Sequence, residues 1–286
     1  MDTPFDRPLR RLRRDRAAPL FREADYLHRH AAEEMLDRLD SVTRSFSRAL
    51  IMGGADGLLG ERLRERDIET VSVDPGRKFA ERAGGLACDE DRLPFADASF
   101  DLVLSVGLLD SVNDLPGALV LIRRTLRPDG LFLGAFAGAG SLPRLRAAML
   151  AADAVDGGAS PRIHPQIDVR AAGDLLARAG FALPVADSSP VDVRFPHLFG
   201  LIADLRRMGA TNILASRSRR PIGRAGLAAA AAEFAAAADA DGKTVEHFDI
   251  IHMSGWAPSP DQPRPARRGS AKASLAHTLK PPQGIR

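Results

Sequence analysis

The chain has 286 residues, of which 45% are hydrophobic and 27% charged, a composition typical of a folded globular protein. Its single cysteine, Cys88, excludes an internal disulfide or a thiolate cluster and fits a reducing compartment. No apolar run approaches the length that a membrane helix requires, and no signal-peptide core is present, so we expect no transmembrane segment.

The formal net charge of +3 is unevenly distributed. Residues 1–20 and 257–286 are both basic, which leaves a net negative body between them. Basic residues confined to the ends, with one Trp and one Tyr in the chain, argue against nucleic acid as a partner. Asp2, Asp6 and Asp15 lie among the N-terminal arginines, whereas transit peptides are poor in acids. We therefore expect a cytoplasmic protein.

The chain begins with an arginine-rich segment, Asp6–Arg16, which we predict to be helical after Pro8. Its arginines are most simply placed in solvent, with covering the mouth of a site as the alternative. Apolar residues at a period of 3.6 predict a second helix over Ala24–Leu39.

A strand–loop–helix unit follows, and the rest of the chain is organised around it. Ala49–Met52 is a short apolar run that breaks into the glycine-rich turn Gly53–Gly57, and Leu58–Arg66 has a helical pattern. Such a turn lets the backbone approach a ligand and points a helix N-terminus at it. Asp74 ends the next apolar run about 20 residues later, the spacing of a carboxylate that binds a ribose diol. An ordinary βαβ unit without a ligand is the alternative interpretation.

Strands and helices then alternate, and each strand is hydrophobic throughout, which predicts a mostly parallel sheet covered on both faces. The elements expected here are strands at Thr70–Val73, Gly85–Ala87, Leu102–Ser105 and Leu131–Phe136, and helices at Arg77–Ala83 and from Asp114 onward. Ligands of such sheets bind at the carboxyl ends of the strands. Gly53, Gly57, Asp74, Asp89 and Ser105 all lie at these ends, so we predict that they form one binding site.

Beyond Ala135 the pattern is less diagnostic. We expect helices at Ser141–Ala151, Arg170–Ala179, Pro196–Met208 and Ala225–Ala238, strands at Val185–Val193 and Phe248–Met253, and an arginine-containing linker at Thr211–Arg224. That linker is a candidate surface for an acidic protein partner. The Pro-, Ser- and Arg-rich tail is predicted to be disordered. The expected organisation is an N-terminal helical segment (1–40), one main domain (41–256) and a basic tail (257–286).

These motifs resemble those of the class I S-adenosylmethionine-dependent methyltransferases. The resemblance rests on the glycine turn, Asp74, Asp89 before Leu93-Pro94-Phe95, Phe100-Asp101-Leu102-Val103, and Leu126-Arg127-Pro128-Asp129-Gly130. It implies a doubly wound α/β fold with a mostly parallel, seven-stranded, Rossmann-like sheet, N-terminal helices and a helical insertion. It also implies that the last strand, Phe248–Met253, is antiparallel and lies at the edge of the sheet. It also implies S-adenosylmethionine as cofactor, with Asp74 on the ribose hydroxyls and Asp89 on the adenine amino group. The implied reaction is methyl transfer to a protein or small-molecule acceptor.

A narrower resemblance extends over most of the chain. It includes Phe5-Asp6-Arg7, Arg14-Asp15-Arg16-Ala17-Ala18, Val112-Asn113-Asp114-Leu115-Pro116, Asp204-Leu205-Arg206 and Gly255-Trp256. These segments are similar to a subfamily that contains a mitochondrial complex I assembly factor, regarded as a protein-arginine hydroxylase. The resemblance therefore implies an alternative function: hydroxylation or assembly of a respiratory complex I subunit without methylation.

The glycine turn departs from the family pattern. Ile51 stands where the family has an acid, and Ala55 replaces the middle glycine, so a weakened cofactor site is expected. Asp56 is the acid within the turn that would restore some negative charge.

No catalytic residue is assigned from the sequence. Asp110 and His164 are candidate general bases near the strand ends, each with a structural role as the alternative. His247, Asp249 and His252 have suggestive spacing, but on a strand they are more simply solvent-facing, and no metal is predicted. Cys88 is expected to be a small buried residue.

Overall fold

The computed structural model describes residues 3–55 and 57–262, and its centre is a seven-stranded sheet with the order β3-β2-β1-β4-β5-β7-β6. Five strands, β1 to β5, run parallel, whereas β7 is antiparallel to both of its neighbours. The strands are β1 Arg48–Met52, β2 Glu69–Asp74, β3 Leu86–Ala87, β4 Phe100–Val106, β5 Leu126–Ala137, β6 Ala182–Phe195 and β7 Thr244–Trp256. This order confirms the doubly wound, mostly parallel fold expected from the sequence.

We expected the last strand, β7, at the edge of the sheet, and this prediction was wrong. It pairs with β5 on one side and with β6 on the other, so the edge is β6. The backbone groups of β7 are thus paired on both sides, and its side chains Ile250, Ile251 and Met253 are buried.

Nine α-helices are described: α1 Arg7–Ala17, α2 Tyr26–Asp40, α3 Leu58–Arg64, α4 Arg77–Arg82, α5 Leu115–Thr125, α6 Pro143–Asp156, α7 Val169–Arg178, α8 Leu198–Met208 and α9 Arg224–Ala236. An aspartate caps the N-terminus of three of them. The Asp6, Asp114 and Asp168 carboxylates accept hydrogen bonds from the N–H groups of Leu9, Gly117 and Ala171. Such caps satisfy backbone donors that have no partner within the helix. The helix predicted from Asp114 onward is confirmed, since α5 begins directly after this residue.

The core has one layer on each face of the sheet. Alternate residues of β5 divide between them: Leu131 and Leu133 pack with α2, α3, α6, α8 and α9, whereas Phe132 and Phe136 pack with α5 and α7. Helices on both faces explain why the strands are hydrophobic at every position.

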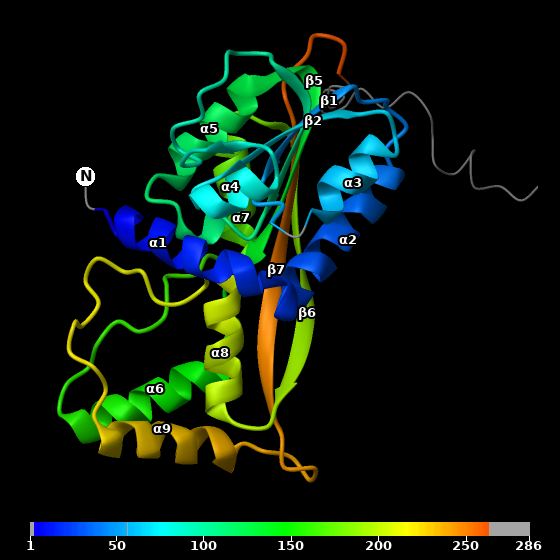
Figure 1. Cartoon of the computed structure of the whole chain (residues 1–286). Coiled ribbons are helices and arrows are strands. Elements are labelled where there is room, and N and C mark those ends of the chain that lie inside the picture. Colours follow the sequence, from blue (N-terminus) through cyan, green and yellow to red (C-terminus); the bar gives the residue numbers. More distant parts are fainter. Residues whose placement is uncertain (1–2, 56, 263–286) are drawn as a thin grey trace, which may run out of the picture.

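The long strands β6 and β7 extend past the parallel strands and carry α6, α8 and α9 (Figure 1). Buried Glu246 of β7 accepts hydrogen bonds from the N–H groups of Arg144 and Leu145, and this fixes the start of α6. Helix α1 lies between this helical group and the parallel part of the sheet (Figure 1). The functional site is built where these three parts meet.

Most of the tail predicted to be disordered, residues 263–286, lies outside the described residues. Among the helices that are described, none is long and apolar enough to span a membrane.

Candidate active site at the carboxyl ends of the strands

The glycine turn lies where β1 ends beside β4. Gly53 has φ +80°, and a Cβ on it would lie 2.4 Å from the carbonyl oxygen of Val106, so no other residue fits there without a shift. Gly57, also at positive φ, precedes α3. Next to the turn, Ser105 is fully buried, and its hydroxyl has no hydrogen-bond partner among the described residues. Gly53, Ser105 and Asp74 therefore lie at the carboxyl ends of neighbouring strands, as the sequence predicted.

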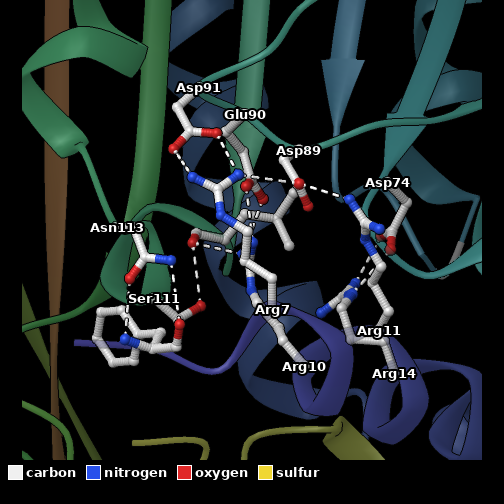
Figure 2. A network of polar contacts seen from close by, with 12 residues as sticks. Arg7, Arg10, Arg11, Arg14, Asp74, Asp89, Glu90, Asp91, Ser111 and Asn113 are labelled. Atoms are coloured by element: carbon white, nitrogen blue, oxygen red, sulfur yellow. Dashed lines mark hydrogen bonds and ion pairs between the residues drawn. The ribbon is translucent and has the colours of Figure 1, made fainter. Parts of the chain in front are cut away.

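Asp74, at the end of β2, is buried and paired with Arg14 of α1. Arg14 Nε and Nη2 donate to the two carboxylate oxygens at 2.8 and 2.6 Å, and the N–H of Gly76 donates to Oδ1 at 2.7 Å (Figure 2). The guanidinium of Arg14 also lies over the Phe79 ring, 4.8 Å from its centroid. The carboxylate expected to bind a ribose is thus held in a fixed orientation by a residue from the N-terminal helix.

Three further arginines of α1 bind the acidic loop that follows β3 (Figure 2). Asp89 Oδ2 accepts from Arg7 at 3.0 Å and from Arg11 at 2.6 Å, and Arg7 also pairs with Asp91. Arg10 binds both oxygens of Glu90, at 2.7 and 2.8 Å, and donates to the carbonyl oxygen of Leu108 at 3.0 Å. We call Arg7, Arg10, Arg11 and Arg14 the inner arginines.

Burial and charge act against each other in this network. Burial favours the protonated form of Asp89, but the guanidinium groups of Arg11 and Arg7 outweigh it and hold the pKa of Asp89 below its usual value. Burial likewise disfavours the charged form of Arg10, and Glu90 more than compensates, so the pKa of Arg10 is raised. Asp89 and Arg10 are therefore both ionised at neutral pH.

The inner arginines correct the simpler sequence interpretation, which placed the arginines of this helix in solvent. Residues 7, 10, 11 and 14 are spaced i, i+3, i+4 and i+7, which brings them to one face of a helix. That spacing was the available signal. What the sequence did not indicate was that Glu90 and Asp91 would face this helix, because they lie about 80 residues away.

Beside this network is a cavity of about 920 Å³. Its walls come from α1, α2, the ends of β4 and β5, α6, α8 and the segment after α8. Asp110 and His164, the two candidate bases, both line it, as do apolar side chains such as Met149 and Ile202. Gly53, Gly57, Asp74 and Asp89 do not line it. The cavity is thus a second compartment, next to the predicted cofactor residues.

Asp110 is the most unusual group in the cavity. It lies in the short turn after β4, and its Oδ1 is buried without a hydrogen-bond partner among the described residues. Burial raises the pKa of Asp110 to about 6, although Arg10 and Arg14 act in the opposite direction. A buried carboxylate oxygen without a donor is costly unless a ligand or water supplies one. Asp110 is therefore suited to accept a hydrogen bond or a proton near neutral pH.

Two histidines of the cavity are neutral. Burial lowers the pKa of His164 to about 4, and its Nε2 accepts a hydrogen bond from the N–H of Ile213 at 3.0 Å. Burial lowers the pKa of His28 to about 3, and its Nδ1 has no partner among the described residues. His28 lies against Gly107, where an added Cβ would come within 2.5 Å of Nε2. The accepting nitrogen of His164 already has a partner, so Asp110 is the better candidate base. His28 was not among the residues predicted from the sequence.

The residues of β7 with suggestive metal-ligand spacing do not form a site. His247 and Asp249 lie on one face of the strand, and His247 Nδ1 contacts Asp192 at 2.8 Å. His252 points to the other face, where it contacts Ser189. Within the described part of the chain no group of three metal-ligating side chains is found. Cys88 is only part-buried, and burial raises the pKa of its thiol to about 12, so it is protonated at neutral pH.

The two departures in the glycine turn have packing roles. Ile51 is buried in the core between the sheet and α3, and therefore brings no charge to the turn. Ala55 packs against the cluster formed by Ala17, Phe21 and Phe79, so its methyl group helps to seat the N-terminal segment. Asp56 lies outside the described residues.

Comparison with known proteins agrees with this architecture. Residues 50–134 match the family model described as "Methyltransferase domain". The chain is 35% identical to "Arginine-hydroxylase NDUFAF5, mitochondrial" of Danio rerio, over 96% of this chain and 89% of the relative. It is 30% identical to "Malonyl-[acyl-carrier protein] O-methyltransferase" of Laribacter hongkongensis, over 89% of each chain. Among solved structures, the YcgJ protein of Bacillus subtilis has a TM-score of 0.56 at 15% identity, covering 81% of this chain and 100% of that protein, and shows the fold.

These relatives also correct one expectation. We predicted a cytoplasmic protein, but the NDUFAF5 relatives of Danio rerio, Mus musculus and Homo sapiens are all named as mitochondrial. The prediction was wrong because it treated acids among N-terminal arginines as evidence about targeting. In the structure this segment is a helix of the folded domain, whose Asp6 caps it and whose arginines bind the acidic loop. By its sequence relatives and its fold, the chain belongs to the class I S-adenosylmethionine-dependent methyltransferase-like family, in the group that includes the mitochondrial arginine hydroxylases.

Proposed function

We propose that this protein is an enzyme that binds S-adenosylmethionine at the strand ends and transfers its methyl group to a protein side chain held in the neighbouring cavity. The observation that carries the proposal is Asp110, whose buried Oδ1 has no donor among the described residues and which lines a cavity of about 920 Å³. Ligands of doubly wound sheets bind at this edge, so the cavity lies where an acceptor would meet a cofactor.

The residues at the strand ends fit the cofactor, with one ribose contact fewer than the family pattern. Asp74 Oδ1 already accepts two hydrogen bonds and Oδ2 one, so one lone pair remains for a ribose hydroxyl. Asp89 Oδ1 accepts no hydrogen bond from the described residues, which leaves it for the adenine amino group. The unpartnered Ser105 hydroxyl and the turn at Gly53 and Gly57 would complete the site.

The protein's part in catalysis is to position the acceptor and to take up its proton. S-adenosylmethionine, when bound, supplies an activated methyl group, so most of the acceleration comes from orientation. An acceptor N–H or O–H that donates to Asp110 Oδ1 would be held in the cavity at the carboxyl end of β4. With its pKa raised to about 6, Asp110 is ionised at neutral pH and yet basic enough to accept a proton. The apolar walls exclude water from the acceptor.

The second candidate function is hydroxylation of a protein arginine, and the names of the relatives favour it. Several NDUFAF5 proteins at 35–37% identity are named arginine hydroxylases. A guanidinium group has several N–H donors, which suit an unpartnered carboxylate such as Asp110. Hydroxylation would additionally require an oxidant and a source of electrons. An arginine of a respiratory complex I subunit is the acceptor that these relatives suggest for either reaction.

Calorimetric titration with S-adenosylmethionine and S-adenosylhomocysteine tests the cofactor half of the proposal. We expect binding that Asp74→Ala weakens strongly, with Asp174→Asn on exposed α7 as the matched control. Absence of binding at millimolar ligand would contradict it.

Mass spectrometry of an arginine-containing acceptor protein tests the reaction. A gain of one methyl group supports transfer, whereas a gain of one oxygen supports the second candidate. Asp110→Asn should abolish either product while leaving cofactor binding intact.

A further inference from the structure

Helix α1 presents a second set of arginines, on the face turned away from the acidic loop. Arg13 and Arg16 do not share the i, i+3, i+4, i+7 spacing of the inner arginines, and both line the cavity together with Arg206 from the end of α8. We call Arg13, Arg16 and Arg206 the outer arginines. They come from two elements that are far apart in the sequence and meet at the cavity.

The outer arginines have no carboxylate partners among the described residues. Arg13 donates to the Thr211 hydroxyl at 2.9 Å and to the carbonyl oxygen of Asn212, both of which are uncharged. Arg16 and Arg206 are exposed, and neither forms an ion pair with a described residue. Long cationic side chains that are held together without anions repel one another.

The pKa of Arg13 reflects the positive charges around it. Burial and the nearby charges of Arg217, Arg16 and Arg206 lower its pKa, and Asp6 opposes them only in part. Two other arginines in the neighbourhood are already neutralised: Arg207 pairs with Glu23 and Asp204, and Arg217 pairs with Asp6. A local excess of positive charge therefore remains beside the cavity that Asp110 lines.

From this arrangement we propose that the outer arginines dock an acidic segment of the protein substrate, with carboxylates flanking the side chain that enters the cavity. The inference rests on the proposed function, because it assumes that the cavity holds an acceptor side chain. Three cations beside a cavity that opens to the surface suit a short acidic segment with one inserted side chain. A long polyanion would also meet the net negative body of the domain, residues 21–256.

Fluorescence anisotropy with labelled peptides tests the inference on the full chain. One short peptide carries a central arginine flanked by Asp and Glu, and its match carries Asn and Gln at those positions. At low salt we expect the acidic peptide to bind about tenfold more tightly, and the difference to shrink as salt screens the charges. Equal affinities for the two peptides would overturn the inference.

The variant Arg16→Glu/Arg206→Glu should remove this preference. Both side chains are exposed, so the fold should be kept, which circular dichroism checks. The matched control is Arg64→Glu/Arg178→Glu, which changes the net charge equally at exposed positions outside the cavity lining. We expect a loss of about tenfold for the first pair and little change for the control. A similar loss in both would overturn the inference.

Two further outcomes separate this inference from the proposed function and from nucleic-acid binding. A single-stranded oligonucleotide that binds more tightly than the acidic peptide, and depends on the same arginines, would replace the acidic segment with a polynucleotide and so overturn the inference. Acidic and neutral peptides that are modified equally well would overturn it while leaving the proposed function intact. Conversely, tight and arginine-dependent binding of the acidic peptide without any mass change would support docking and count against the proposed function.

Discussion

Helix α1 carries the four inner arginines and also two of the outer arginines, Arg13 and Arg16, and the two sets differ in the partners of their guanidinium groups. The inner arginines bind Asp74, Asp89, Glu90 and Asp91 in close ion pairs, and two of them are almost fully buried. The outer arginines meet a hydroxyl, a carbonyl group and solvent. One short helix thus holds both charges that belong to the fold and charges that remain available to a partner.

The difference shows that the role of an arginine depends on the partners of its side chain and not on its position in a basic segment. Removing one member of a buried pair leaves an uncompensated charge, whereas removing an exposed and unpaired charge costs little. Substitutions at the two sets should therefore separate stability from binding.

The largest effect on stability is expected for Arg10→Met, which leaves the buried carboxylate of Glu90 without its ion-pair partner. We expect the free energy of unfolding to fall by about 3–5 kcal/mol, measured by urea denaturation. The double variant Arg10→Met/Glu90→Leu should recover most of that loss, because no buried charge is left unpaired. A single variant as stable as the parent would contradict the structural role of the inner arginines.

Asp110→Asn should raise the free energy of unfolding, and the size of this increase should depend on pH. The pKa of Asp110 is raised from 3.8 to about 6 in the folded state, so its contribution to stability is full below about pH 4 and lost as pH rises through 6. Relative to the parent, the variant should be more stable by about 2–3 kcal/mol at pH 8 and unchanged near pH 4. Thermal unfolding across this range checks it. A constant difference would show that Asp110 is not perturbed.

An intermediate effect is expected at the start of the helix. Asp6 accepts a hydrogen bond from the N–H of Leu9 and pairs with Arg217, so it caps α1 and ties it to the segment after α8. Asp6→Ala should cost about 1 kcal/mol, and Asp6→Asn less, because Asn retains the cap. Equal losses in denaturant melts would instead assign the effect to the ion pair with Arg217.

The smallest effect on stability is expected for the outer arginines. Arg16→Ala and Arg206→Ala should each change the free energy of unfolding by less than about 0.5 kcal/mol, since neither side chain has an ionic partner in the described structure. Their phenotype should appear in substrate binding alone. A loss comparable to that of Arg10→Met would erase the distinction between the two sets.

Much of the sheet was predictable because its signals are local. Continuous apolar runs such as Leu102–Ser105 identify strands buried on both faces, and the glycine turn, Asp74 and Asp89 lie where these strands end. The role of Asp101 in the Phe-Asp phrase, by contrast, depends on residues more than 50 positions away in the sequence. Its carboxylate accepts hydrogen bonds from the N–H groups of Ser47 and Arg48 and so joins the start of β1 to β4.

The cavity was much less predictable, because its walls come from segments up to 240 residues apart, such as those of Arg10 and Ile250. Asp110 and His164 were recognised as candidates, but nothing local to them indicated that they share a cavity. His28 gave no signal, since its importance comes from lying against Gly107.

Local sequence patterns were enough to predict the alternation of strands and helices, the polar strand ends and the family, because hydrophobic periodicity and turn residues act over short distances. Tertiary contacts were needed to show which arginines are neutralised, and which arginines and which carboxylate have no partner among the described residues. Those properties depend on side chains from distant parts of the sequence, because the energy of a charged group is set by the groups that surround it in the folded protein.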